Sequence, residues 1–142
     1  AALVDAFGAE VLVCDPFTSP DSAPFPMVSR NEGYERADVI CFHNSGEDCL
    51  LSDEHLDQLK PGVLILNVAR GGVASESTLL RGLQAEIIGG LWLDVFETEP
   101  YMGPLVGHAQ TLLTPHVGSY TSECRVNMEG DAVRNLLASL AG

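Results

Sequence analysis

The sequence is poor in basic residues and has no long apolar run. Its 142 residues include 7 lysines and arginines against 20 aspartates and glutamates, which gives a formal charge of −13. A chain with so few cations offers no basic patch to a nucleic acid backbone or an anionic membrane surface, so we expect neither as a partner. No apolar stretch approaches membrane-spanning length and no secretion signal is visible, so the predicted location is the cytoplasm.

Metal-binding patterns are also missing. The four cysteines are far apart, and no Cys-x-x-Cys or Cys/His ligand spacing accompanies them. We therefore predict no metal site. Cys14 and Cys41 stand inside apolar runs, where buried free thiols are common, and this agrees with a reducing compartment.

What the sequence does contain is the composition of one globular domain, with 46% hydrophobic and 19% charged residues. Apolar runs that predict strands lie at residues 10–14, 37–43, 63–67, 87–95 and 111–114. Helical patterns lie at residues 1–7, 52–60, 75–85 and from residue 121 onward, and the proline-rich stretch 16–34 predicts a surface loop. Strands that alternate with helices at this spacing indicate βα units and a mostly parallel sheet.

Charged groups stand just beyond the carboxyl ends of three predicted strands. Arg70 precedes two glycines, and a charge at the end of a buried strand is costly unless an anion meets it. Arg70 is therefore either an anion-binding residue or a structural arginine paired with a carboxylate. Asp94 with Glu99 follows the next strand, and His116 follows the last. An arginine, a histidine and a carboxylate in this arrangement are the groups needed to oxidise a hydroxy acid.

Three segments carry a family resemblance: Leu66–Gly72 (LNVARGG), Leu93–Pro100 (LDVFETEP) and Leu113–Gly118 (LTPHVG). They resemble the D-isomer-specific 2-hydroxyacid dehydrogenases, in particular the phosphoglycerate dehydrogenase group. The resemblance implies an α/β fold with a Rossmann-like, three-layer, doubly wound parallel sheet. It also implies NAD as cofactor and a small 2-hydroxy or 2-keto acid as substrate.

The resemblance assigns catalytic roles to three residues. Arg70 would bind the substrate carboxylate and carbonyl oxygen, and His116 would be the acid/base that exchanges the hydroxyl proton. Glu99 would hydrogen-bond His116 and keep its ring oriented. Hydride would pass directly between C2 of the substrate and the nicotinamide.

The resemblance also assigns cofactor contacts. Asp94 would meet the carboxamide of the nicotinamide, and Gly118 would let backbone approach it. Asp15 would hold the adenosine ribose and favour NAD over NADP, unless it is only a turn aspartate before proline. His43 is either near the cofactor or a core histidine. The residues expected to contact NAD are Asp15, His43, Ala69, Arg70, Asp94, His116 and Gly118.

The sequence departs from the family at its start, because it contains no Gly-x-Gly-x-x-Gly turn for the pyrophosphate. It begins with Ala1, inside the helix that would follow that turn. We therefore expect residues 1–142 to be a partial NAD-binding domain, with the first strand and the substrate domain absent. The strands at 10–14 and 38–43 would lose the neighbour between them, which predicts exposed apolar surface and either a rearranged sheet or pairing with a second copy.

Three hypotheses about the function remain open. The first is the NAD-binding portion of a dehydrogenase that transfers hydride between NAD and a D-2-hydroxy acid, inactive by itself. The second is a corepressor-like, NAD-dependent binding module, and the third is a truncated fragment without function. Among the remaining candidates, we expect His55 and His108 to be solvated and Trp92 to lie in the core.

Overall fold

The structure is a computed structural model that describes residues 1–46 and 48–141. Its helices are α1 (Ala2–Ala6), α2 (Arg30–Arg36), α3 (Asp53–Leu56), α4 (Glu76–Gln84) and α5 (Ser122–Ala141), with short 3-10 turns η1 (Pro20–Ser22) and η2 (Gly71–Val73). Its strands are β1 (Val39–Phe42), β2 (Val63–Asn67), β3 (Ile88–Leu93) and β4 (Thr111–Leu113). The polar loop predicted at residues 44–48 includes residue 47, which lies outside the described residues.

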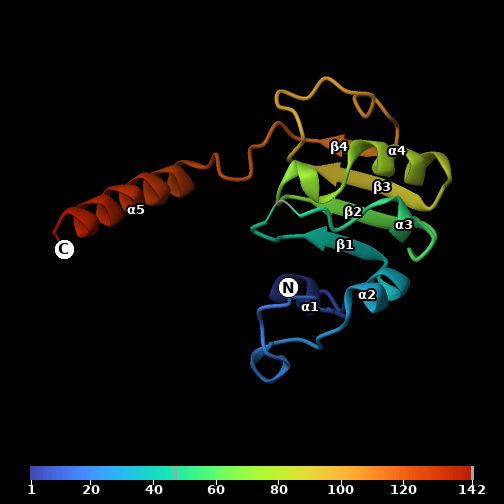
Figure 1. Ribbon diagram of the computed structural model, residues 1–142, viewed down its shortest axis with the longest axis horizontal. Helices are drawn as coiled ribbons and strands as arrows, with labels where there is room; N and C mark the ends of the chain where they lie inside the picture. Colours follow the sequence, from blue (N-terminus) through green and yellow to red (C-terminus); the bar gives the residue numbers. More distant parts are fainter. Residues whose placement is uncertain (47, 142) are drawn as a thin grey trace.

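The four strands form one parallel sheet in the order β1-β2-β3-β4 (Figure 1). The register places the last residue of each strand beside the last residue of its neighbour: Phe42 pairs with Asn67, Asn67 with Leu93, and Leu93 with Leu113. The predicted α/β fold with a parallel sheet is confirmed. Because the strands end in one row, the loops that follow them meet along a single edge.

The hydrophobic core lies between the sheet and the helices α3 and α4. Side chains alternate along β2, so Val63 and Ile65 are fully buried on this face while Leu64 is 44% exposed on the other. From α4, Leu79 and Leu83 pack into the same core. The helix predicted at residues 75–85 is therefore confirmed.

Side-chain caps and an ion pair hold α3 and α4 together. The Ser75 hydroxyl accepts a hydrogen bond from the Thr78 N–H at 3.2 Å and so caps α4, as its position predicts. Asp53, at the start of α3, accepts a hydrogen bond from the Thr78 hydroxyl at 2.7 Å and pairs with Arg81. The two helices therefore present one joined layer to the sheet.

His55 was expected to be solvated, and this is wrong. Its ring is buried, and its Nδ1 accepts a hydrogen bond from the backbone N–H of Ser52 at 3.1 Å. The ring also packs edge-on against the buried Tyr34, with 5.4 Å between ring centroids. A histidine at the third position of a helix can reach back to the cap as glutamate does, and that contact draws it inward.

The opposite face of the sheet exposes apolar side chains. Val39, Leu64, Trp92 and Leu112 are between 38% and 61% exposed. The prediction that Trp92 is a core residue is therefore wrong, and so is the prediction that Cys41 is buried. The strand pattern predicted apolar faces correctly, but it could not tell that only one of the two faces is covered within the described residues.

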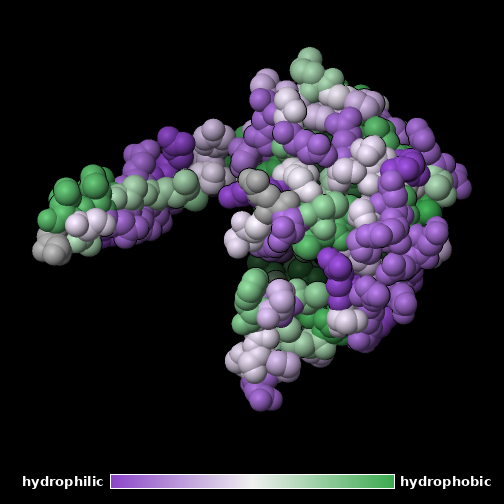
Figure 2. All heavy atoms as spheres, in the orientation of Figure 1, coloured by the Kyte–Doolittle hydropathy of each residue, from purple (hydrophilic) through white to green (hydrophobic). Residues whose placement is uncertain are grey.

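The C-terminal helix α5 projects away from the sheet (Figure 1). The helix predicted from residue 121 onward is confirmed, and the Thr121 hydroxyl caps it by accepting a hydrogen bond from the Cys124 N–H at 3.1 Å. Apolar side chains on α5 are more than half exposed, and the helix is coloured green most strongly toward its free end (Figure 2). Among the described residues, no helix combines the length and the apolar character needed to cross a membrane.

The N-terminal segment differs most from the prediction. Helix α1 is present and Gly8 follows it with a positive φ of 83°. Residues 10–14 were predicted to be a strand, but this is wrong, because only an isolated bridge joins Val13 to Met27. Cys14 is exposed, contrary to expectation. An apolar run becomes a strand only beside a strand partner, and the sheet offers this segment none.

The predicted loop at 16–34 was too long, because α2 begins inside it. The Ser29 hydroxyl accepts a hydrogen bond from the Glu32 N–H at 3.2 Å, which caps the helix. Serine followed three residues later by glutamate is an N-terminal helix signal. The prolines between residues 16 and 26 hid this signal by suggesting that the whole stretch was irregular.

Glycine substitutions test the close packing of β3. A Cβ at Gly89 would lie 2.6 Å from the backbone oxygen of Gly62, so Gly89→Ala should lower the free energy of unfolding by about 1–3 kcal/mol. The matched control is Gly33→Ala in α2, where the nearest atom is 3.9 Å away, and it should stabilise by up to about 1 kcal/mol. Urea unfolding measures both, and equal effects would contradict the packing described for Gly89.

Candidate active site

Arg70 follows β2 in a turn that the side chain of Asn67 shapes. Asn67 is almost fully buried; its Oδ1 accepts a hydrogen bond from the Ala69 N–H at 3.1 Å, and its Nδ2 donates to the Arg70 carbonyl at 2.9 Å. The sequence reasoning did not single out Asn67. Its signal was a polar residue at an inward position of β2, two residues after Ile65, where only a fully bonded side chain is tolerated.

The guanidinium of Arg70 is exposed beside this turn. Its Nη1 donates to the carbonyl oxygen of the preceding residue, Ala69, at 2.6 Å. Within residues 1–46 and 48–141, none of the ion pairs includes Arg70. The carboxylate partner of the structural alternative is therefore not seen for Arg70 among these residues.

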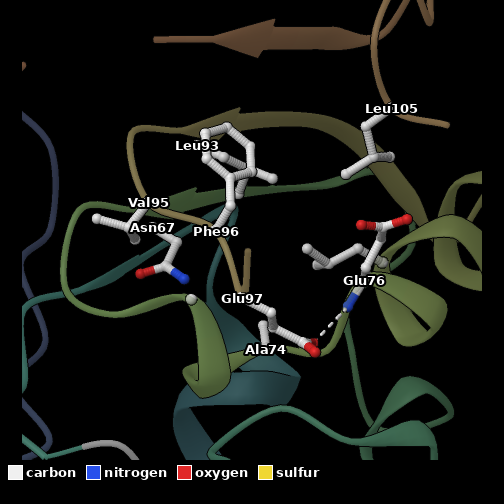
Figure 3. Close-up of a pocket in the computed structure, with 10 residues that line it drawn as sticks. Asn67, Ala74, Glu76, Leu93, Val95, Phe96, Glu97 and Leu105 are labelled. Carbon is white, nitrogen blue, oxygen red and sulfur yellow. Dashed lines mark hydrogen bonds between the residues drawn. The ribbon is translucent and has the colours of Figure 1, made fainter. Parts of the chain in front are cut away.

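The turn after Arg70 packs directly on the segment after β3. A Cβ at Gly71 would lie 2.0 Å from the carbonyl carbon of Phe96, so only glycine fits there. A cavity of about 10 Å³, large enough for one water molecule, lies between these two segments. Figure 3 shows Glu97 beside it, directed toward the backbone of Glu76, whose N–H donates to Glu97 Oε1 at 3.3 Å.

Asp94, at the end of β3, holds the loop that carries His116. Its Oδ1 accepts hydrogen bonds from the Thr114 hydroxyl at 2.6 Å and the Val117 N–H at 2.9 Å, and its Oδ2 accepts from the Gly118 N–H at 2.9 Å. Burial opposes the ionisation of Asp94, but these hydrogen bonds outweigh it and hold the pKa of this carboxyl below its ordinary value. The carboxylate is thus fixed by both of its oxygens.

His116 and Glu99 meet, as the sequence predicted. The Nδ1 of His116 lies 2.8 Å from Glu99 Oε2, and the other Glu99 oxygen accepts the Phe96 N–H at 3.0 Å. The hydrogen bond with His116 lowers the pKa of Glu99, and the Phe96 N–H adds to the effect. His116 has a positive φ of 54°, an uncommon conformation that the hydrogen bonds of the neighbouring residues maintain.

Asp15 and His43 are not among the hydrogen-bond partners of Asp94, Glu99 or His116. Asp15 accepts the Phe17 N–H at 2.8 Å and the Thr18 hydroxyl at 2.7 Å, and these two bonds lower the pKa of its carboxyl. It is thus a turn aspartate, although each oxygen keeps a further lone pair. His43 follows β1 and is exposed, with its Nε2 3.1 Å from Cys41 Sγ, so the core alternative for His43 is wrong.

Taken together, the loops after β2, β3 and β4 bring an exposed arginine, a fixed carboxylate and a histidine–glutamate pair to one edge of the sheet. Residues 1–118 match the family model described as D-isomer specific 2-hydroxyacid dehydrogenase, NAD binding domain. The chain belongs to this family. As a member of the D-isomer-specific 2-hydroxyacid dehydrogenases, it is an NAD-binding domain with a Rossmann-like α/β fold.

Individual relatives agree with the family match. The chain is 36% identical over 149 residues to the D-3-phosphoglycerate dehydrogenase of Mycobacterium leprae, which covers all of this chain and 28% of that protein. It is 34% identical to the (S)-sulfolactate dehydrogenase of Chromohalobacter salexigens, with 99% of this chain and 48% of that protein covered. The crystal structure of a glyoxylate reductase from Paecilomyes thermophila matches with a TM-score of 0.88 and 28% identity, over 97% of this chain and 44% of that one.

The chain therefore spans between about a quarter and a half of these D-2-hydroxyacid dehydrogenase relatives. The matched region includes the strand row and the loops that carry Arg70, Asp94, Glu99 and His116. Among the described residues, no group of three or more histidine, cysteine or acidic side chains is placed to hold a metal ion.

The Asp94 hydrogen bonds can be tested by pH. Asp94→Asn should lower the free energy of unfolding by about 2 kcal/mol at pH 7, because an amide nitrogen replaces one acceptor. Because the folded pKa of Asp94 is depressed, its stabilisation is present above the unfolded pKa and is lost as the pH falls through the folded pKa. The difference between the wild type and the variant should therefore shrink below about pH 4.

The control for this comparison is Asp38→Asn. Asp38 forms a surface ion pair with Lys60 at 2.5 Å, and its side chain is 81% exposed, so little stability should change. Urea unfolding between about pH 7 and about pH 2.5, which passes through the depressed pKa of Asp94, measures both variants. A constant difference for Asp94→Asn across this range would show that the charge of Asp94 is not what stabilises the loop.

Proposed function

We propose that this NAD-binding domain works in an enzyme that transfers hydride between NAD and a small D-2-hydroxy acid. Arg70, Glu99 and His116 are the proposed catalytic residues. The observation that carries the proposal is the 2.8 Å contact between His116 Nδ1 and Glu99, on the same sheet edge as an exposed Arg70. This is the arrangement of a positioned acid/base beside an anion-binding group.

The side chains divide the work as follows. Arg70 binds the carboxylate of the substrate, because a planar guanidinium matches a carboxylate with two parallel hydrogen bonds. His116 takes the hydroxyl proton during oxidation and returns it during reduction. Because Glu99 holds Nδ1, Nε2 is the nitrogen that exchanges this proton. When bound, NAD supplies the acceptor for the hydride that leaves C2 of the substrate.

The described residues fit the nicotinamide end of NAD. Gly118 brings its backbone against Asp94, where a Cβ would lie only 3.1 Å from Oδ2. We propose that Asp94, Gly118 and Ala69, the residue before Arg70, face the nicotinamide. His43 follows the end of β1 and so lies at the same edge of the sheet.

The adenosine end depends on Asp15. Its two carboxylate oxygens keep lone pairs that can accept hydrogen bonds from the ribose hydroxyls, and its charge would repel a 2′-phosphate. We therefore propose NAD over NADP for this chain.

The proposal also covers the domain organisation and the oligomeric state. Residues 1–142 form a partial NAD-binding domain that would act with a substrate domain, which agrees with the 28% of the mycobacterial relative that the chain spans. A homodimer in the cytoplasm is the proposed working form. The exposed apolar faces of the sheet and of α5 support an association with further protein.

Cofactor choice provides the first test. NADH should bind at least about tenfold more tightly than NADPH, a difference of about 1.4 kcal/mol, and Asp15→Ser should reduce this ratio. Titration followed by NADH fluorescence measures both dissociation constants. Glu10→Gln is the control, because it removes an exposed charge five residues away without touching the turn. Equal affinity for the two cofactors would contradict the role given to Asp15.

The acid/base role gives a second test in an active enzyme that contains this domain. His116→Ala should lower kcat by about 10²–10⁴-fold and leave the dissociation constant of NADH nearly unchanged, because the histidine acts on the substrate proton. Steady-state kinetics and an NADH titration separate the two effects. An equal loss of turnover and of NADH affinity would assign His116 to cofactor binding instead.

A further inference from the structure

We infer that Tyr101 is a positioning residue for the Glu99–His116 pair and acts through Phe96. The inference rests on the proposed function, in which that pair is the acid/base unit. Neither the family match nor the sequence motifs assign a role to Tyr101.

The argument begins at the carboxylate of Glu99. One oxygen contacts His116 Nδ1 at 2.8 Å, and the other accepts the backbone N–H of Phe96 at 3.0 Å. The orientation of the carboxylate, and with it the orientation of the His116 ring, therefore depends on where the backbone of Phe96 lies. The Glu99 side chain is 37% exposed, so packing around it is not sufficient to fix it.

Two neighbours fix Phe96, one at its backbone and one at its ring. Its backbone rests on Gly71, at a separation that admits no Cβ. Its ring is stacked on the ring of Tyr101, with 4.4 Å between centroids and 12° between planes. Stacked aromatic pairs contribute beyond their buried area and restrict both rings to one relative orientation.

Tyr101 is in turn attached to the core. Its hydroxyl oxygen accepts the Leu105 N–H at 3.2 Å, and Leu105 is almost fully buried. Gly103 makes room for this contact, because a Cβ there would lie 2.4 Å from the Tyr101 hydroxyl. Burial raises the pKa of Tyr101, and the neighbouring Glu76 carboxylate adds to the effect, so the hydroxyl stays protonated at neutral pH. The buried Leu105 therefore holds the Tyr101 ring, and the Tyr101 ring holds the stacked ring of Phe96. The Phe96 N–H in turn holds the carboxylate that orients His116.

The test is an NMR titration of the Glu99 carboxyl carbon in the 142-residue chain, assigned with Glu99→Gln, together with the ring nitrogens of His116. In the wild type the hydrogen bond from His116 lowers the pKa of Glu99. Tyr101→Leu should raise the Glu99 titration midpoint toward the ordinary value and shift the His116 Nδ1 signal. Tyr101→Phe keeps the stacked ring but loses the hydroxyl that accepts the Leu105 N–H, so it should shift the midpoint in the same direction and by less than Tyr101→Leu.

If Tyr101 only stabilised the fold, its substitution would not change the Glu99 titration midpoint. Gly89→Ala, which disturbs packing elsewhere in the sheet, is the control, and it should lower stability without moving the Glu99 midpoint. If Tyr101→Leu behaves in the same way, the inference is overturned. If Tyr101→Leu does not fold, Phe96→Leu applies the same test, since it removes the stack and keeps the backbone N–H. These signals need neither cofactor nor substrate, so a failure of the proposed hydride transfer would appear separately, in binding and turnover.

Discussion

The carboxylate of Asp94 is the contact on which the arrangement of the site depends. It accepts three hydrogen bonds from the segment that follows β4, two of them from the backbone N–H groups next to His116. A buried carboxylate without such donors would be costly, and backbone donors without an acceptor would be costly as well. Each therefore stabilises the other, and the end of β3 determines where the histidine lies.

Contacts at the strand ends also fix the rest of this edge of the sheet. The parallel register aligns the last residues of all four strands, and short loops then need few contacts to bring their side chains together. Asn67 closes the turn before Arg70 with its side-chain amide, and Gly71 lets that turn rest on the backbone of Phe96. Backbone contacts at the strand ends therefore determine the geometry of the site. The exposed side chains of Arg70 and His116 project from the turns that these contacts hold.

Local signals in the sequence were sufficient to predict much of the fold and part of the candidate site. The apolar run at 63–67 followed by Arg70 was predicted from neighbouring residues, and so were the helices that begin after Ser75 and Thr121. The His116–Glu99 contact was also predicted, although by family resemblance. Long-range effects were not accessible: residues 10–14 lack a strand partner, and His55 is drawn inward by a contact with Ser52 and Tyr34. The exposure of Trp92 could not be predicted either, because periodicity does not reveal which face of a sheet is covered.

Trp92 is the single tryptophan of the chain, and it lies on the apolar sheet face that is exposed. An indole in contact with water emits at longer wavelength than one surrounded by hydrocarbon. The tryptophan emission of the protein therefore reports on this face alone, without a label and without a second indole at the strand-end edge. Any layer that comes to lie against the sheet, whether from the same polypeptide or from another, would be visible as a shift of the spectrum to the blue.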